Sequence, residues 1–156
     1  MAGSPYITQA GYERLNNELH ALWVKRRRVT DKLAAAAAEG DRSENADYIY
    51  RKKQLREMDR RVRYLARRLD GITVADRLPE ERDKVFFGAW VTVADEAGSE
   101  VEYRIVGPDE FDADQRWISM DAPMGQALLG RRLDDAVTVR LPEGTRELDI
   151  VAIRYE

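Results

Sequence analysis

The sequence predicts an α+β fold: a long antiparallel two-helix coiled-coil hairpin, then a small domain with an antiparallel sheet and one short helix. Glycine and proline are nearly absent across residues 12–70, where Gly40 is the only one of either, and they recur from residue 71 onward. A heptad seam runs on both sides of Gly40, whereas the second half alternates apolar and polar residues as strands do. We therefore expect two domains, residues 1–75 and residues 76–156.

The hairpin is predicted by seam residues spaced alternately three and four apart. The seam lasts about four heptads on each side of Gly40, so each arm of about 30 residues would extend roughly 45 Å at ~1.5 Å per residue. Its members are Tyr12, Leu15, Leu19, Leu22, Arg26, Val29, Leu33 and Ala36 on the first arm, and Tyr48, Arg51, Leu55, Met58, Val62, Leu65, Leu69 and Ile72 on the second.

The second half is predicted to form short strands separated by turns rich in glycine and proline. A short helix is expected over residues 124–129, with Asp121 as its N-cap, Pro123 early in the helix and Gly130 at its end. The strand candidates are residues 86–94, 101–106, 117–120, 137–141 and 148–155.

Composition excludes several kinds of chemistry. The chain has no cysteine and a single histidine, His20, so disulfides, thiolate metal sites and histidine clusters are ruled out. No apolar run approaches the roughly 18 residues of a membrane span, and the first residues lack the features of a signal peptide. We therefore expect a cytoplasmic protein with no membrane partner.

Charge is divided unevenly along the chain. Residues 1–75 hold 16 Lys/Arg and 10 Asp/Glu, a balance of +6, whereas residues 76–156 hold 10 and 19, a balance of −9. This asymmetry favours two modules with different partners over ordinary solvated faces.

The predicted turn, residues 40–48, concentrates carboxylates at the far end of the hairpin. Asp41 and Glu44 are three residues apart, and magnesium is typically bound by one or two carboxylates together with waters and phosphates. The same spacing also fits a capping box at the start of the second helix. Because a helix N-terminus disfavours cations, the pair alone would bind magnesium weakly, which favours a site completed by another molecule.

The second arm is strongly basic. Residues 51–68 carry nine cations against two carboxylates, Glu57 and Asp59, and tyrosines are interleaved with them at positions 48, 50 and 64. Such a surface suits a single nucleic-acid strand, through phosphate neutralisation and base stacking. The alternative is an ordinary solvated helix face.

The motif Gly-Asp-Arg-Ser-Glu-Asn-Ala-Asp-Tyr at residues 40–48 resembles the tip of the bacterial Gre transcript cleavage factor family. The resemblance covers nearly the whole chain, and it favours the GreB branch. Besides the tip motif, the residues that carry the resemblance are Thr8, Gly11, Tyr12, Leu15, Glu18, Leu19 and Leu22, and residues 60–65, 84–91, 103–107 and 123–129.

The resemblance implies an FKBP-like second domain and a factor that binds bacterial RNA polymerase through its secondary channel. Such a factor is not an enzyme alone, but it stimulates the polymerase's own cleavage of the 3′-proximal RNA in backtracked complexes. Asp41 and Glu44 would be the catalytic and metal-holding pair, supplied in trans, with Ser43 and Asn45 supporting the tip. Mg²⁺ would be shared with the polymerase active site and not bound stably by the free protein.

The resemblance further implies contact between the basic arm and the 3′ segment of the nascent RNA. Two other interpretations stay open: a channel-binding regulator that does not stimulate cleavage, and a nucleic-acid-binding coiled coil that acts without polymerase. The residues expected to contact RNA are Arg51, Lys52, Lys53, Arg56, Arg60, Arg61 and Arg63.

Overall fold

The computed structural model describes residues 3–39, 45–75 and 77–156 and divides the chain into two compact units. The helical unit comprises residues 12–71. The sheet unit combines residues up to Gly11 with residues 72–156. The sequence analysis had grouped the first eleven residues with the hairpin instead.

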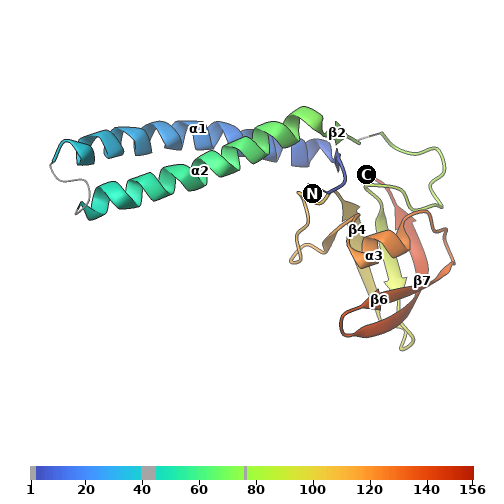
Figure 1. The fold of residues 1–156 in the computed structure, drawn as a ribbon. Coiled ribbons are helices and arrows are strands. Elements are labelled where there is room, and N and C mark those ends of the chain that lie inside the picture. The colour runs from blue at the N-terminus through green and yellow to red at the C-terminus, as the bar shows by residue number, and fades with distance from the viewer. Residues whose placement is uncertain (1–2, 40–44, 76) are drawn as a thin grey trace. The chain divides into compact units, whose positions relative to one another are not determined.

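The helical unit is an antiparallel pair of long helices, α1 (Gln9–Ala37) and α2 (Ala46–Gly71), which run side by side (Figure 1). Their 29 and 26 residues give lengths of about 43 and 39 Å at ~1.5 Å per residue. Every predicted seam position is buried or half-buried, whereas Trp23 and His20, which lie off the seam, are exposed. The predicted hairpin is therefore confirmed.

Two ion pairs join the helices beside the apolar seam. Arg26 Nε donates to Asp59 Oδ1 at 2.6 Å, and Arg61 Nε donates to Glu18 Oε2 at 2.6 Å. The hydrogen bond from Arg61 lowers the pKa of Glu18, and the bond to Asp59 raises the pKa of Arg26. Charged residues flanking a coiled-coil seam commonly form such interhelical pairs, which fix the partner helix in register.

The sheet unit is built on five strands in the order β5-β4-β3-β7-β6. All neighbours pair antiparallel except β4 and β5, which are parallel, so the sheet is mixed and the expectation of a purely antiparallel sheet needs this correction. The strands are β3 (Trp90–Ala94), β4 (Glu100–Val106), β5 (Trp117–Ser119), β6 (Ala136–Leu141) and β7 (Gly144–Arg154).

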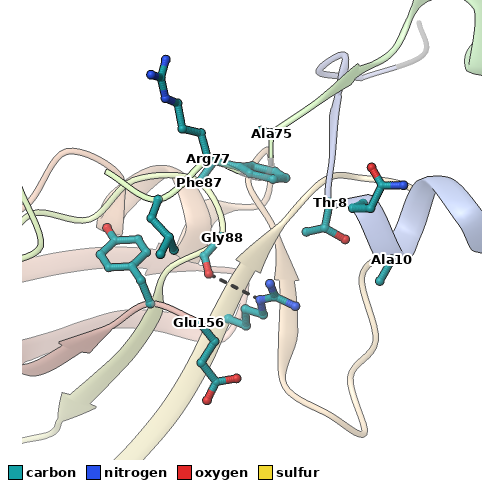
Figure 2. Close-up of a pocket in the computed structure, with 11 residues that line it drawn as sticks. Thr8, Ala10, Ala75, Arg77, Phe87, Gly88 and Glu156 are labelled. Atoms are coloured by element: carbon teal, nitrogen blue, oxygen red, sulfur yellow. Dashed lines mark hydrogen bonds between the residues drawn. The ribbon is translucent and has the colours of Figure 1, made fainter. Parts of the chain in front are cut away.

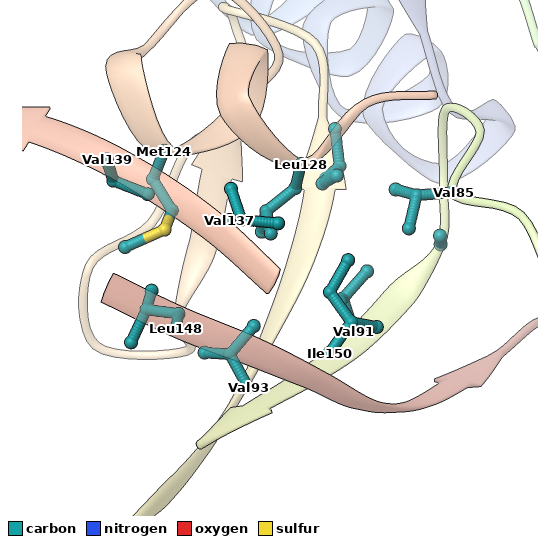
Figure 3. Close-up of a cluster of buried hydrophobic side chains, with 11 residues drawn as sticks. Val85, Val91, Val93, Met124, Leu128, Val137, Val139, Leu148 and Ile150 are labelled. Atoms are coloured by element: carbon teal, nitrogen blue, oxygen red, sulfur yellow. The ribbon is translucent and has the colours of Figure 1, made fainter. Parts of the chain in front are cut away.

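One face of this sheet carries the core of the unit. The short helix α3 (Pro123–Leu128) inserts Leu128 among apolar strand residues such as Val91, Val137 and Ile150, all at most 1% exposed (Figure 3). Buried and exposed residues alternate along β6, as the predicted apolar–polar alternation requires, because side chains on a strand point to opposite faces in turn.

Helix α3 begins as predicted near Pro123, but its cap differs. Ala122 occupies the N-cap position and makes no side-chain hydrogen bond to the helix. The prediction that Asp121 caps this helix is therefore wrong. Its carboxylate instead accepts hydrogen bonds from the backbone N–H and the hydroxyl of Ser4, 117 residues away.

Contacts that no sequence pattern predicted hold the N-terminal segment. The short strands β1 (Tyr6–Ile7) and β2 (Thr73–Val74) pair parallel. Glu110 is fully buried, and its Oε2 accepts from the backbone N–H groups of Thr8 at 3.1 Å and Gly107 at 2.9 Å. The Thr8 hydroxyl donates to Oε1 of the same carboxylate. A Cβ on Gly11 would lie 2.1 Å from that Oε1, so only glycine fits there.

Candidate functional site

The expected tip lies between the end of α1 at Ala37 and the start of α2 at Ala46. Of the four residues assigned to it, Asp41, Ser43 and Glu44 lie outside the described residues, and Asn45 is described.

Asn45 joins the ends of the two helices. Its Oδ1 accepts a hydrogen bond from the Tyr48 backbone N–H at 3.0 Å, and its carbonyl accepts from the Ile49 N–H at 3.1 Å, which is the geometry of an N-cap. Its Nδ2 donates to the carbonyl of Ala36 at 2.7 Å, on the last turn of α1. The described N-cap of α2 is thus Asn45, four residues beyond the start of the alternative capping box at Asp41.

The first turns of α2 contain a carboxylate and a cation that bind each other. Asp47 is exposed and forms an ion pair with Arg51, with Nε and Oδ1 3.5 Å apart. Arg51 is half-buried on the seam, and its Nη1 also donates to Gln54 at 3.1 Å. Nowhere among the described residues do three or more acidic or histidine side chains gather where they could hold a metal ion.

The outer face of α2 carries a row of exposed cations spaced three and four residues apart. On a helix such residues form one continuous stripe, here spanning about 21 Å at ~1.5 Å per residue, and the seam lies on the other side of the helix. None has a hydrogen-bond or ion-pair partner among the described residues. We call this stripe the outer cation row: Lys53, Arg56, Arg60, Arg63 and Arg67.

The structure divides the seven predicted RNA-contacting cations into two groups. Lys53, Arg56, Arg60 and Arg63 belong to the outer cation row. The other three contact neighbours within the helical unit: Arg51 binds Asp47, Arg61 binds Glu18, and the Lys52 amine lies 5.8 Å from the ring centroid of Tyr48. The sequence analysis left out Arg67, although its spacing from Arg63 continues the row.

Exposed apolar side chains lie near the start of this row. Ile49 is 53% exposed and Tyr50 is 58% exposed, so both side chains are accessible to a ligand. The outer surface of α2 near the tip therefore offers an aromatic ring and an aliphatic side chain beside unpaired cations. That combination suits stacking of bases together with phosphate neutralisation.

Two family models match the chain, and the boundary between the two matches falls close to the predicted boundary between the hairpin and the sheet domain. A family model described as "Transcription elongation factor, N-terminal" matches residues 5–74, and one described as "Transcription elongation factor, GreA/GreB, C-term" matches residues 79–155. The chain belongs to the GreA/GreB family of transcription elongation factors.

Individual relatives agree with this GreA/GreB membership. The chain is 53% identical over 156 residues to transcription elongation factor GreB of Yersinia pestis, covering 99% of this chain and 91% of the relative. It is 52% identical over 157 residues to GreB of Pasteurella multocida, covering 100% and 99%. Among solved structures, GreA factor homolog 1 of Thermus thermophilus is 27% identical, with 96% and 97% coverage and a TM-score of 0.44.

The two family models and the two GreB relatives confirm the resemblance inferred from the sequence, including the preference for the GreB branch. The GreA/GreB family is one of transcription elongation factors rather than of enzymes. In the ranges that the structure describes, no helix is long and apolar enough to cross a membrane.

Proposed function

We propose that the chain binds bacterial RNA polymerase, places its helical hairpin in the secondary channel and stimulates the polymerase's cleavage of the 3′-proximal RNA in backtracked complexes. The observation that carries the proposal is the junction at Asn45, whose side chain ties the start of α2 to the last turn of α1. In the sequence, Asp41 and Glu44 follow α1 and precede α2, and in this proposal they act from the end of the hairpin where these two helix ends are tied.

The support suits delivery into a deep site. Two helices of about 40 Å, by the rise of ~1.5 Å per residue, can carry a few side chains through a channel that a globular domain could not enter. Interhelical ion pairs and a buried seam stiffen the two helices against each other.

The tip carboxylates fit magnesium by their donor chemistry, because hard oxygen ligands are what this ion takes. Asp41 and Glu44 would hold it jointly with ligands from the polymerase. Bound there, Mg²⁺ supplies the charge stabilisation that a two-metal phosphodiester hydrolysis requires.

The outer cation row supplies a second contact in this proposal. Its five cations have no partner among the described residues and face away from the seam, so they are available to RNA phosphates. Arg61, one position after Arg60, is already bound to Glu18 and contributes to the hairpin instead.

An RNA cleavage assay on backtracked polymerase complexes tests the tip. Asp41→Asn and Glu44→Gln, singly and together, should each slow stimulated cleavage by at least about tenfold, the usual effect of losing a group that supports a catalytic metal. Asp47→Asn is the matched control: it removes a neighbouring carboxylate that binds Arg51, and the cleavage rate should stay within about twofold of wild type.

Three results would count against the proposal. If the double variant stimulated RNA cleavage at the wild-type rate, the two tip carboxylates would have no role in cleavage. Slowed nucleotide addition without any cleavage product would favour a channel-binding regulator. Capture of naked RNA without binding to core polymerase would favour a nucleic-acid-binding coiled coil. The proposal also predicts that the chain mixed with RNA alone cleaves nothing.

A further inference from the structure

A row of alternating tryptophan and arginine crosses the sheet unit on the face opposite its core. Trp90 on β3 pairs in register with Arg104 on β4 and with Arg154 on β7, and Trp117 on β5 pairs with Arg104. Because neighbouring residues on a strand point to opposite faces, this row lies on the side away from Val91.

Arg104 lies between two indole rings. Its guanidinium carbon is 5.2 Å from the ring centroid of Trp90 and 5.2 Å from that of Trp117, and the two rings are nearly perpendicular at 82°. Contact with two aromatic rings restricts the rotation of a guanidinium. The fork of Arg104 is therefore oriented before any ligand arrives.

The two arginines of the row differ in their hydrogen bonding. Arg154 binds both carboxylate oxygens of Glu102, at 2.9 and 3.0 Å, and also Glu156. Arg104 makes one long hydrogen bond, 3.4 Å from Nε to the carbonyl of Gly88, dashed in Figure 2. A guanidinium has five N–H donors, and those on the two terminal nitrogens of Arg104 have no acceptor among the described residues.

Arg104 lines a cavity of about 190 Å³ within the sheet unit (Figure 2). Two other polar groups of the wall are engaged: the Thr8 hydroxyl donates to Glu110, and the Tyr155 hydroxyl donates to the Lys84 carbonyl and accepts from the Phe86 N–H. Burial lowers the pKa of Arg104, an effect that the nearby carboxylates of Glu110 and Glu156 oppose. Arg77, also in this wall, is exposed, whereas Arg104 is half-buried, so the fork of Arg104 is the half-buried donor set of the wall whose terminal nitrogens lack an acceptor among the described residues.

The rest of the wall limits the ligand. Ala10, Leu78 and Phe87 contribute apolar surface, and Glu156 contributes a negative charge. Residues 76–156 carry a balance of −9, which repels a polyanion such as RNA, with one charge on every phosphate, more strongly than it repels a single carboxylate. A single carboxylate with apolar neighbours matches both the planar fork and the apolar wall, because arginine binds carboxylates through two parallel hydrogen bonds.

We propose that this cavity receives an aspartate or glutamate side chain, flanked by apolar residues, from a protein partner, and that Arg104 binds that carboxylate through both arms of its fork. The inference rests on the proposed function in taking RNA polymerase as the partner. It adds a specific docking residue in the sheet unit, distinct from the tip and from the outer cation row.

The test measures the dissociation constant for core polymerase and, in parallel, RNA cleavage in backtracked complexes. Arg104→Gln removes the fork, and Arg104→Lys keeps the charge but loses the planar, two-armed geometry. Both should weaken polymerase binding by about tenfold or more, the usual cost of losing a charge-assisted pair. At saturating factor, cleavage should stay near the wild-type rate. Arg140→Gln is the matched control, because Arg140 is exposed on β6 with no partner among the described residues.

Folding is checked through far-ultraviolet circular dichroism and a urea titration, because Arg104 contacts Trp90 and Trp117 and its replacement changes their near-ultraviolet signal even in a folded chain. If Arg104→Gln unfolds, Arg104→Lys decides the question. Unchanged polymerase affinity in a folded Arg104 variant would overturn the inference while leaving the proposed function intact. If Arg104→Gln instead lost affinity for naked RNA and kept polymerase affinity, a phosphate ligand would replace the carboxylate and the inference would fail. If the wild-type chain failed to bind polymerase, both this inference and the proposed function would be wrong.

Discussion

Replacing Asn45 by alanine is expected to loosen both helix ends at once. The substitution removes the acceptor for the Tyr48 N–H at 3.0 Å and the donor to the Ala36 carbonyl at 2.7 Å. Loss of an N-cap costs about 1 kcal/mol, and loss of a further hydrogen bond about as much. The local opening free energy at this junction should therefore fall by about 2 kcal/mol, equivalent to roughly 30-fold in an equilibrium constant.

Amide hydrogen exchange followed by NMR measures this opening residue by residue. The Tyr48 amide binds Asn45 directly, so its protection factor should drop by about 30-fold in Asn45→Ala, while amides in the middle of α2 change little. Asn45→Asp separates the two bonds, because a carboxylate keeps the cap acceptor but cannot donate to Ala36. It should preserve protection at Tyr48 and increase exchange only in the last turn of α1.

The reasoning is refuted if Asn45→Ala leaves the Tyr48 amide as protected as in wild type, since the cap would then contribute nothing. It is also refuted if Asn45→Asp and Asn45→Ala give the same exchange pattern on both helices. Under the proposed function, Asn45→Ala should lower the cleavage rate at saturating factor without weakening polymerase binding, because it disturbs the support of the tip and not a docking surface.

Three further predictions concern other parts of the chain. Gly11→Ala should lower the free energy of unfolding by about 1–3 kcal/mol, because its Cβ would lie 2.1 Å from a buried carboxylate oxygen, whereas Gly71→Ala, with nothing within 4 Å, should be neutral in the same urea titration. Arg60→Gln should reduce the slope of log affinity against log salt for RNA by about 0.7, the value for one phosphate contact on a single strand, and an equal reduction in Arg61→Gln would contradict the division of these cations. Burial raises the pKa of Tyr155 above its usual 10.0, so its contribution to stability is complete below pH 10.0 and is lost as the pH rises through the higher folded value. Urea titrations from pH 8 to 11, an experimental range of about three units around the phenol's usual pKa, should show a fall that Tyr155→Phe lessens.

The sequence was sufficient for the parts of the fold that depend on local periodicity. Heptad spacing placed every seam residue on a buried or half-buried face, and alternation identified the five strands of the main sheet. Both patterns repeat within a few residues, so they can be recognised in the sequence without knowing which elements pack against the helix or strand. Gly125, an unexpected residue inside α3, has a reason that only the structure shows: a Cβ there would lie 2.2 Å from the Ser119 carbonyl oxygen.

Long-range polar contacts were not predictable in this way. Asp121 had the position and chemistry of a helix cap, but Ser4 binds its carboxylate from 117 residues away. Glu110 follows a turn sequence that gives no sign of burial. It is fully buried, and its carboxylate accepts a hydrogen bond from the Thr8 N–H, 102 residues earlier. The Trp–Arg row likewise depends on strand register, which alternation alone does not fix.

The two adjacent arginines Arg60 and Arg61 show why a count of charges describes this hairpin poorly. They are the same residue type at neighbouring positions, but a step of about 100° around the helix separates them. That rotation places Arg61 beside the seam, where Glu18 binds it, and places Arg60 on the outer cation row, where no described residue does. The cations nearest the seam therefore stabilise the hairpin, and the cations farthest from it are available to a ligand. The heptad position of each cation, which can be read from the sequence, decides whether it lies beside the seam or on the outer cation row. The same criterion places Arg67 on the outer cation row.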